Sequence, residues 1–486
     1  MKLIYGVNDK PKFGQLLIFA IQQLLAIMAA TLVVPVIIGH NMSPAAALFG
    51  AGVGTLVYIL FTQAKSPVFL GSSFAFLGSM AAAFAGGVSM AVGYLGLIIG
   101  AAFAGLVYVI IAIAVKIAGV NWLNKLMPPV VIGPTVAIIG LSLAGNAIGD
   151  LQVGGVTKEV TEWTIGATDN VIQTIESVSA EGETILLTQI TNNVPVANVL
   201  ICVLIGLITL IVTILCSTYG KKMARLIPFV IGILAGYCLA TIFTVIGNAA
   251  NIDSLKIINF GIFSDLVKDG VGLGTFLQLP DFTFLTALGG FSEISGEYIA
   301  KIAVAYVPVA FVVFAEHVAD HKNISSIIEK DLLEDPGLHR TLLGDGIGSF
   351  AGAIFGGCPN TTYGESIGCV AITKNASVVT ILAAAIGAIL ISFLSPFVAF
   401  VNSIPKCVMG GVCMALYGFI AVSGLKMLKN VDLEQNRNLF AASVILIAGI
   451  GGLTLTFGQI TITSVACALI LGIIVNLLVS KSKENQ

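Results

Sequence analysis

A single glutamate stands inside a broken stretch of an otherwise apolar region, the segment GGCPNTTYGESIGC from Gly356 to Cys369. This segment combines a proline, small hydroxylated residues and a tyrosine with Glu365, whose charge no neighbouring residue compensates. A carboxylate at bilayer depth costs roughly 2.5–3.5 kcal/mol even on the lenient insertion scale, so it indicates a substrate or ion path. We therefore predict that Glu365 takes part in binding a solute or an ion.

A second group of titratable residues ends a long apolar run, AYVPVAFVVFAEHVADHKN. Glu316 and Asp320 are four residues apart and share one face of a helix. Two like charges in a poorly hydrated place repel, so one carboxyl keeps a proton that it can release and regain during a transport cycle. His317 and His321 have the same spacing, but without a third ligand we expect no metal ion. The alternative is that Asp320, His321 and Lys322 form the hydrated cytoplasmic end of the helix. We favour this alternative for His321 and a functional role for Glu316.

The composition is that of a membrane protein. The 486 residues are 57% hydrophobic and only 10% charged, and the mean hydropathy is +1.02. Apolar runs of about 18 or more residues recur along the chain, which is the length needed to cross the hydrocarbon core. The eight cysteines show no metal-type spacing, so we interpret them as reduced core residues. A net charge of −2 without a basic face argues against a nucleic-acid partner.

The apolar runs predict fourteen membrane spans in two sets of seven. The first run is too long for the core of a signal peptide, and we interpret it as a retained span. The spans are expected near residues 13–39, 43–61, 66–86, 91–115, 126–149, 194–216, 226–248, 299–320, 341–357, 360–374, 377–400, 404–425, 438–457 and 460–480.

The distribution of basic residues predicts the orientation of these spans. With a cytoplasmic N-terminus, 18 of the 23 Lys and Arg residues fall in the termini and the even-numbered connections, which are cytoplasmic. The other five fall on the extracellular side. This bias follows the positive-inside rule, so we expect both termini in the cytoplasm. The connection 150–193 carries seven acids and one lysine and is expected to be an extracellular loop.

The two halves of the chain share a spacing of proline and glycine. Pro128 and Gly133 in the fifth span are five residues apart, as are Pro405 and Gly410 in the twelfth. Both residues are common in membrane helices, so chance is an alternative. Because seven is an odd number of spans, two consecutive copies of such a repeat cross the membrane in opposite orientations, as in secondary transporters.

Spans three and ten are equivalent in such a repeat, and both are broken. Span three begins KSPVFLGSSFAFLG and span ten begins GGCPNTTYGESIG, so each has a proline, then extended-favouring residues, then small residues. Non-helical backbone at membrane depth is tolerated only where it is buried or lines a cavity. We predict two short extended pieces that meet near the midplane, each leading into a half-helix whose N-terminus points at a shared site. The alternative is two interfacial loops beside short helices. Phe74 and Tyr363 could supply aromatic faces there, or they could be ordinary packing residues.

Taken together, these segments resemble the nucleobase–ascorbate transporter (nucleobase cation symporter) family, in its bacterial uracil permease branch. The resemblance covers nearly the whole chain and is strongest in GSSFAFLG (71–78), FAEHVADHKN (314–323), KDLLEDPGLHR (330–340) and PNTTYGESIGCVAITK (359–374). It implies an all-α polytopic membrane protein with fourteen transmembrane segments in two inverted repeats of seven and short strands in segments 3 and 10. The first repeat would span 1–248 and the second 299–486, with 249–298 as an extracellular connection. A core domain would consist of spans 1–4 and 8–11, and a gate domain of spans 5–7 and 12–14.

The resemblance also implies a substrate site and a coupling site. Matching residues place Glu316 and Glu365 as the glutamates that hydrogen-bond a nucleobase, with Phe74 packing against its ring. The remaining substrate-binding residues would be Tyr363, Gly364, Ser73 and Ala75. Proton coupling would involve Asp320, Glu316 and His317.

The implied function is uptake of uracil with a proton across the cytoplasmic membrane, by a protein that is not an enzyme and has no cofactor or metal. Uracil is planar and neutral, so carboxylates can accept from its N–H groups and backbone N–H groups can donate to its carbonyls, while uphill uptake requires a coupled ion. The partners implied are the nucleobase, the lipid bilayer and a second copy of the chain, bound through the gate domain.

Two departures from the family pattern keep an alternative substrate open. Asp320 stands where the best-matching uracil permeases have histidine, and Ser366 where the family usually has asparagine. Xanthine or another purine is therefore the alternative, although the TTYGE form is typical of the pyrimidine branch. Anion exchange by the same architecture is less favoured, because it would need a basic group at the helix break.

Overall fold

The computed structural model describes residues 3–119, 121–165, 171–178, 184–221, 223–268, 270–457 and 460–479. The first half of the chain forms α1 (Phe13–Ile38), α2 (Pro44–Phe61), β1 (Leu70–Ser72), α3 (Leu77–Phe84), α4 (Met90–Ala118), α5 (Asn121–Leu126), α6 (Pro129–Ser142), α7 (Ala144–Asp150), β2 (Thr157–Ile165), β3 (Val171–Val178), β4 (Thr184–Pro195), α8 (Val199–Tyr219), α9 (Met223–Leu226) and α10 (Pro228–Ala250).

The second half begins after a connection that holds the short helices α11 (Gly261–Asp265), α12 (Leu273–Phe276) and α13 (Thr283–Ala287). It forms α14 (Gly296–Ile328), α15 (Leu338–Gly356), β5 (Asn360–Thr362), α16 (Gly364–Thr373), α17 (Val378–Ile391), α18 (Ser395–Ser403), α19 (Lys406–Lys426), α20 (Asn436–Ile450), β6 (Leu455–Phe457), β7 (Ile460–Ile462) and α21 (Ser464–Val479).

Many of the predicted spans are continuous helices, and some of these begin at a polar cap. Eight of the helices in the described ranges are long and apolar enough to cross a membrane. The side chains of Ser43, Ser89 and Ser295 accept hydrogen bonds from the first turns of α2, α4 and α14. Such caps satisfy N–H groups that the helix itself leaves unpaired, so they define where each helix begins.

Spans three and ten are broken, as the sequence predicts. β1 and β5 pair as antiparallel strands, with Leu70 opposite Thr362 and Ser72 opposite Asn360. All six strand residues are buried. Each strand then leads into a short helix, through a 3-10 turn (Phe74–Phe76) into α3 and directly into α16. The prediction of two extended pieces that meet and feed half-helices is therefore confirmed, and the interfacial-loop alternative is wrong.

The helices pack as two bundles, which we define by their contacts. The carboxylate bundle consists of α1–α4 with β1 and of α14–α17 with β5, and the second bundle consists of α6–α10 and α19–α21. In the carboxylate bundle, α2 and α15 approach along a seam of glycines. A Cβ at Gly50 would lie 2.3 Å from the carbonyl oxygen of Gly352, and one at Gly54 would lie 2.7 Å from that of Gly348. Small residues four apart allow this close backbone approach between membrane helices.

The second bundle contains the proline–glycine repeat noted in the sequence. Pro128 and Pro405 each directly precede the first residue of a helix, α6 and α19. These two helices also meet at glycines, because a Cβ at Gly133 would lie 2.8 Å from the carbonyl oxygen of Gly424. The two prolines thus have the same place in the two halves, whereas the two glycines of the spacing differ, because a Cβ at Gly410 would meet the backbone of Leu151 and Ala147.

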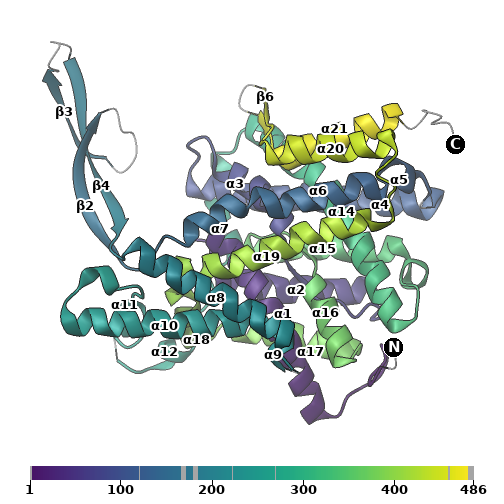
Figure 1. Cartoon of the computed structure of the whole chain (residues 1–486), viewed down its shortest axis with the longest axis horizontal. Helices are drawn as coiled ribbons and strands as arrows, with labels where there is room; N and C mark the ends of the chain where they lie inside the picture. Colours follow the sequence, from purple (N-terminus) through teal and green to yellow (C-terminus); the bar gives the residue numbers. More distant parts are fainter. Residues whose placement is uncertain are drawn as a thin grey trace.

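The sequence prediction missed two groups of strands. Residues 150–193, expected only as a loop, include most of a three-stranded antiparallel sheet of order β2-β4-β3, which projects from the bundles on the side opposite the N-terminal segment (Figure 1). Its strands are rich in Thr, Val and Ile, which favour extended backbone, but the prediction considered only their charge.

The predicted ends of spans 13 and 14 are likewise wrong. Gly451 and Gly452 end α20 early, and the residues that follow form the β6–β7 hairpin.

The charged connector between α14 and α15 is held by ion pairs at its surface. Asp335 accepts from Nζ of Lys330 at 2.7 Å and from Nζ of Lys65 at 2.5 Å. These two lysines lower the pKa of the Asp335 carboxyl. The connector is therefore tied to the turn between α2 and β1.

The glycine seam gives a testable prediction. In Gly50→Ala, the new methyl group meets the backbone of α15, which cannot move aside as a flexible side chain would. We expect a loss of stability of about 1–3 kcal/mol, measured as a lower thermal unfolding midpoint of the detergent-solubilised protein. Gly418→Ala is the matched control, because a Cβ at Gly418 has no neighbour within 4 Å, and it should leave the midpoint unchanged or slightly raised. Equal midpoints for both variants would show that the seam does not need glycine.

Candidate functional site

The N-terminus of α16, which carries Glu365, is fixed by hydrogen bonds around the strand pair. Ser73 N–H donates to the carbonyl of Pro359 at 2.9 Å, and Tyr363 N–H donates to the carbonyl of Phe69 at 3.2 Å. Ser366 Oγ accepts from Phe69 N–H at 3.0 Å and also from the side-chain amide of Gln23. The backbone at the break is thus paired although it is not helical, which buried backbone requires.

Tyr363 holds the two strands together from the side. Its ring covers Gly71, where a Cβ would lie 2.4 Å from ring carbons, and its hydroxyl donates to the carbonyl of Ser72 at 2.6 Å. The side chain is buried and does not line the cavity described next. Its observed contacts are therefore those of a structural residue.

A cavity of about 370 Å³ lies between the two bundles. One wall comes from α1, α14 and α16 of the carboxylate bundle, and the other from α6, α8–α10 and α19 of the second bundle. The lining residues are Ala26, Val136, Ser217, Arg225, Leu226, Pro228, Phe229, Glu316, Ala319, Asp320, Gly364, Glu365, Gly368, Cys369, Ile372, Leu416, Phe419, Ile420, Ser423 and Met427.

The cavity is reached from the face that carries the N-terminal segment, which we call the N-terminal face. Arg225 and Ser423 line it and are exposed, and Ile372 lies at the C-terminal end of α16. Just beyond that end, the backbone carbonyl of Lys374 accepts a hydrogen bond from Ile4 N–H at 2.8 Å. Gly364 is also exposed, so solvent reaches the helix N-terminus itself.

The two walls differ in chemistry. The carboxylate bundle supplies three half-buried acids, Glu316 and Asp320 from α14 and Glu365 from α16. Thr362 Oγ1 donates to Asp320 Oδ2 at 2.8 Å, which connects β5 to α14. The second bundle supplies mostly apolar residues, among them Phe229 and Phe419, whose rings meet edge to face at 5.8 Å. A small planar ligand with N–H donors would find acceptors on one side and apolar surface on the other.

Behind this wall, α14 presents its histidines to the bundle interior. His317 Nδ1 lies 2.7 Å from Asp345 Oδ2 and its Nε2 lies 3.0 Å from Thr341 Oγ1, so both ring nitrogens are bonded to α15. His317 does not line the cavity. The rings of His317 and His321 stack at 4.0 Å.

The expectation that His321 lies at the hydrated end of its helix is wrong. His321 is fully buried, and its Nε2 lies 2.6 Å from Tyr58 Oη. The reason is that α14 continues to Ile328, two turns beyond the predicted end of this span. Lys322 is exposed as expected, whereas Asp320 faces the cavity.

The residues expected from span three lie next to the cavity without lining it. Ser73, Phe74 and Ala75 are buried, and the Phe74 ring contacts the Tyr417 ring edge to face at 5.9 Å. Tyr417 follows Leu416, which does line the cavity. Of the residues that the sequence analysis placed in the site, the structure brings Glu316, Asp320, Gly364 and Glu365 into the cavity.

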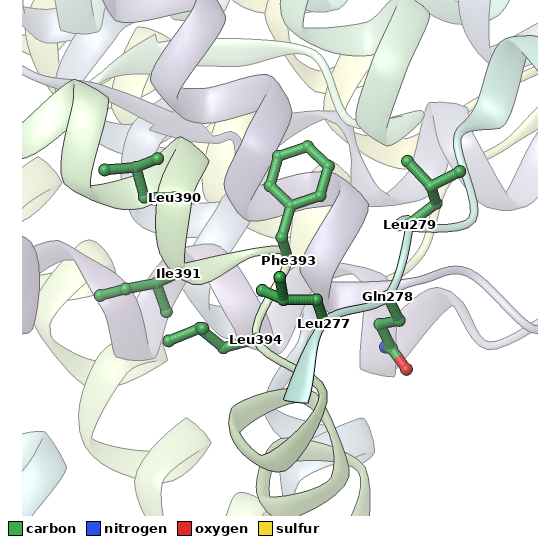
Figure 2. Close-up of a pocket in the computed structure, with 7 residues that line it drawn as sticks. All are labelled: Leu277, Gln278, Leu279, Leu390, Ile391, Phe393 and Leu394. Atoms are coloured by element: carbon green, nitrogen blue, oxygen red, sulfur yellow. The ribbon is translucent and has the colours of Figure 1, made fainter. Parts of the chain in front are cut away.

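A larger hollow elsewhere is apolar and lacks such chemistry. It has a volume of about 530 Å³ and is lined by Leu277, Gln278, Leu279, Leu390, Ile391, Phe393 and Leu394 (Figure 2). Gln278 N–H donates to the carbonyl of Phe393 at 2.9 Å, which pairs the two segments that form it. Among the residues that the structure describes, no charged side chain lines this groove, so we place the candidate site in the smaller cavity.

Sequence reasoning missed several residues of this region. Asp345 is a fully buried carboxyl inside an apolar span, so the rule that singled out Glu365 would also have found it. Arg225, Phe229, Phe419 and Ser423 gave no such signal, because they belong to the second bundle and only the packing brings them to the carboxylates.

Comparisons with known proteins agree with these observations. A sequence model described as the permease family matches residues 14–205 and 184–458. The chain is 36% identical to a protein named uracil permease from Bacillus caldolyticus, over 98% of this chain and 95% of that protein. It is 34% identical to uracil permeases from Bacillus subtilis (strain 168) and Escherichia coli (strain K12), over 100% and 96% of this chain and 97% and 92% of theirs.

Solved structures with the same fold are more distant in sequence. The transmembrane domain of the cyanobacterial bicarbonate transporter BicA has a TM-score of 0.58 at 13% identity, covering 98% of this chain and all of that one. The murine anion transporter Slc26a9 in its inward-facing state has a TM-score of 0.59 at 12% identity, covering 97% of this chain and 69% of that one. The protein is thus a multi-pass membrane protein with two inverted repeats of seven spans, as predicted.

The position of Tyr363 gives a prediction that separates structure from binding. Tyr363→Phe removes the hydroxyl bonded to the Ser72 carbonyl, and we expect the stability to fall by about 1 kcal/mol. The solute affinity should change by less than about twofold, because this side chain does not line the cavity. The measurements are the thermal unfolding midpoint and equilibrium binding on the purified protein.

Tyr306→Phe is the control, because the buried Tyr306 hydroxyl has no hydrogen-bond partner among the described residues, and its removal should not lower the midpoint. A tenfold loss of affinity in Tyr363→Phe with an unchanged midpoint would contradict the structural role.

Proposed function

The chain belongs to the permease family, the nucleobase–ascorbate transporters, and on this premise we propose that it imports uracil across the cell membrane together with a proton. The observation that carries this proposal is the cavity in which Glu316, Asp320 and Glu365 meet. A volume of about 370 Å³ lies in the range of small-molecule sites. Relatives named uracil permease align over nearly the whole chain and support uracil as the solute.

Uracil binding is proposed to use both carboxylates and the start of α16. Glu316 and Glu365 accept hydrogen bonds from the two ring N–H groups. Helix geometry leaves the first N–H groups of α16 without partners in the helix, and these donate to the uracil carbonyls near Gly364. A buried site whose polar groups are all matched rejects analogues that leave one unpaired.

The part of the proposed site from span three acts at another stage of the cycle. The Phe74 ring is in contact with Tyr417 of the second bundle and does not line the cavity in this structure. We propose that Phe74, with Ser73 and Ala75, contacts the base once the bundles move and Tyr417 withdraws. Tyr363 supports the strand pair from behind.

Proton coupling is assigned to Asp320 and Glu316. Uracil is neutral, so its accumulation requires a coupled ion. Asp320 faces the cavity one helical turn from Glu316 and is bonded to Thr362, beside the start of α16. His317, which joins α14 to Asp345, supports this helix from inside the bundle. No cofactor or metal enters the mechanism.

The two bundles are the proposed moving parts, with the carboxylate bundle as the core domain and the second bundle as the gate domain. With both termini in the cytoplasm, as the basic residues indicate, the cavity faces the cytoplasm in this structure. Uracil would enter from the other side after the core domain shifts against the gate domain. A permease moves its solute unchanged, so no catalytic residue is needed. The expected homodimer through the gate domain is part of this proposal.

Purines and anions are the competing substrates. Xanthine or another purine remains the alternative because of Asp320 and Ser366. Ser366 here supports β1 and α1, so its side chain is engaged away from the cavity. An anion would meet three carboxylates in this cavity, which argues against anion exchange although solved neighbours of the same fold are anion transporters.

The proposal predicts uptake of radiolabelled uracil in cells that lack their own permease. Replacing Glu316 or Glu365 by Gln removes a charged acceptor, and we expect each variant to bind uracil about ten- to a hundredfold more weakly. Initial uptake rates and equilibrium binding are the measurements, with xanthine and other bases as competitors. Glu329→Gln, an exposed glutamate in the connector after α14, is the matched control. Uptake of xanthine but not of uracil would refute the substrate, and wild-type affinity in a Gln variant would remove that residue from the site.

Proton coupling is tested separately with Asp320→Asn. We expect this variant to bind and exchange uracil but not to accumulate it, because the amide cannot carry the proton. Counterflow and accumulation driven by a pH gradient, measured in proteoliposomes, distinguish these steps. If accumulation persists in the variant and a protonophore still abolishes it, coupling lies at another group.

A further inference from the structure

One basic side chain lines the same cavity as the three carboxyls. Arg225 is exposed and has no ion-pair partner among the described residues. It is also the only basic residue among those that line the cavity in the described part of the chain. A guanidinium stays charged at all relevant pH values. The cavity therefore contains three groups that can exchange protons and one permanent positive charge.

Arg225 and the carboxyls belong to different bundles. Arg225 lies on α9, the four-residue helix between α8 and α10, and α9 also packs against α1 and α16. Glu365 lies on α16 and the other two acids lie on α14. When one bundle moves against the other and α9 stays with α8 and α10, the distance from the guanidinium to the carboxyls changes.

A nearby cation favours the ionised form of a carboxyl, and the effect is larger where apolar walls limit screening by water. The apolar wall of this cavity, with Phe229 and Phe419, provides such surroundings. A guanidinium that approaches the carboxyls from across this cavity would therefore promote loss of a proton from them.

The other titratable groups near the carboxyls belong to the same bundle as the acids, and some of them are hydrogen-bonded to one another. Asp345 is bonded to His317, and His321 is bonded to Tyr58, all inside the carboxylate bundle. Cys369 lines the cavity on α16 itself. These groups move with the acids, so they cannot change the proton affinity of the acids between the two states in the way that Arg225 can.

We propose that Arg225 is the counter-charge that expels the coupled proton on the N-terminal face. In the state described here, the guanidinium lies at the cavity and favours ionised carboxyls. When the carboxylate bundle moves toward the other face, the acids leave Arg225 behind and regain protons there. This inference rests on the proposed proton-coupled uptake and assigns the side of proton release to one residue of the second bundle.

The test uses right-side-out membrane vesicles from cells that produce the full chain and lack their own permease. Initial uptake of radiolabelled uracil is measured at fixed external pH while the internal pH is varied. In Arg225→Gln, the carboxyls hold their proton to higher pH, so the internal pH of half-maximal uptake should rise by about half a unit or more. Arg225→Lys keeps the charge and should keep the wild-type profile.

Arg437→Gln is the matched control, because Arg437 is exposed at the start of α20, donates to Gln435 at 2.8 Å and does not line the cavity. It should leave the profile unchanged. Arg225→Met provides a second neutral side chain, and uracil binding at acidic pH confirms that each variant is folded. An unchanged profile in folded Arg225→Gln and Arg225→Met overturns the inference.

A weaker uracil affinity at every internal pH, with no shift of the profile, also overturns the inference, because Arg225 would then contact the substrate. Failure of the proposed function has a different signature. In that case wild-type vesicles take up no uracil, or their uptake does not respond to a pH gradient.

Discussion

The antiparallel pairing of β1 and β5 is the constraint on which the rest of the structure depends. Extended backbone inside a membrane protein must find hydrogen-bond partners within the protein, because lipid offers none. Three residue pairs of the two strands, with Ser73 N–H and Tyr363 N–H bonded on either side, meet this requirement. The pairing also fixes where α16 begins, and therefore where Glu365 stands.

Close helix packing makes room for this pairing. Thr55 on α2 accepts from Leu70 N–H at 2.9 Å, and Asn360 Nδ2 donates to the Gly50 carbonyl at 3.0 Å. The Asn360 contact lies at the glycine seam of α2 and α15, because a Cβ at Gly54 or Gly352 would collide with Asn360 Nδ2. The strand pair and the glycine seam are thus parts of one arrangement, in which small residues bring polar groups within hydrogen-bond distance at membrane depth.

The division into two bundles gives the two walls of the cavity their different chemistry. One bundle carries the acids and the strand pair, and the other carries the apolar wall and Arg225. In the proposed transport cycle, groups within a bundle keep their distances, whereas groups across the cavity change theirs. A solute site with acids on only one wall can therefore alter its charge environment during transport without rearranging its own hydrogen bonds.

The sequence by itself determined the spans, their broken pair and the acids, because hydropathy, proline and an uncompensated carboxylate are local signals. The resemblance to the family assigned Glu316, Asp320, Gly364 and Glu365 to the substrate and coupling sites, and the structure places these four residues at one cavity. The sequence did not determine the burial of His321 or the length of α14, because these depend on neighbours distant in the chain. Only the tertiary structure decided that Phe74 faces Tyr417, that Tyr363 supports Ser72 and that Arg225 shares the cavity. The physical reason is that a side chain's partner across two packed bundles is set by helix approach and rotation, which no local pattern of residues specifies.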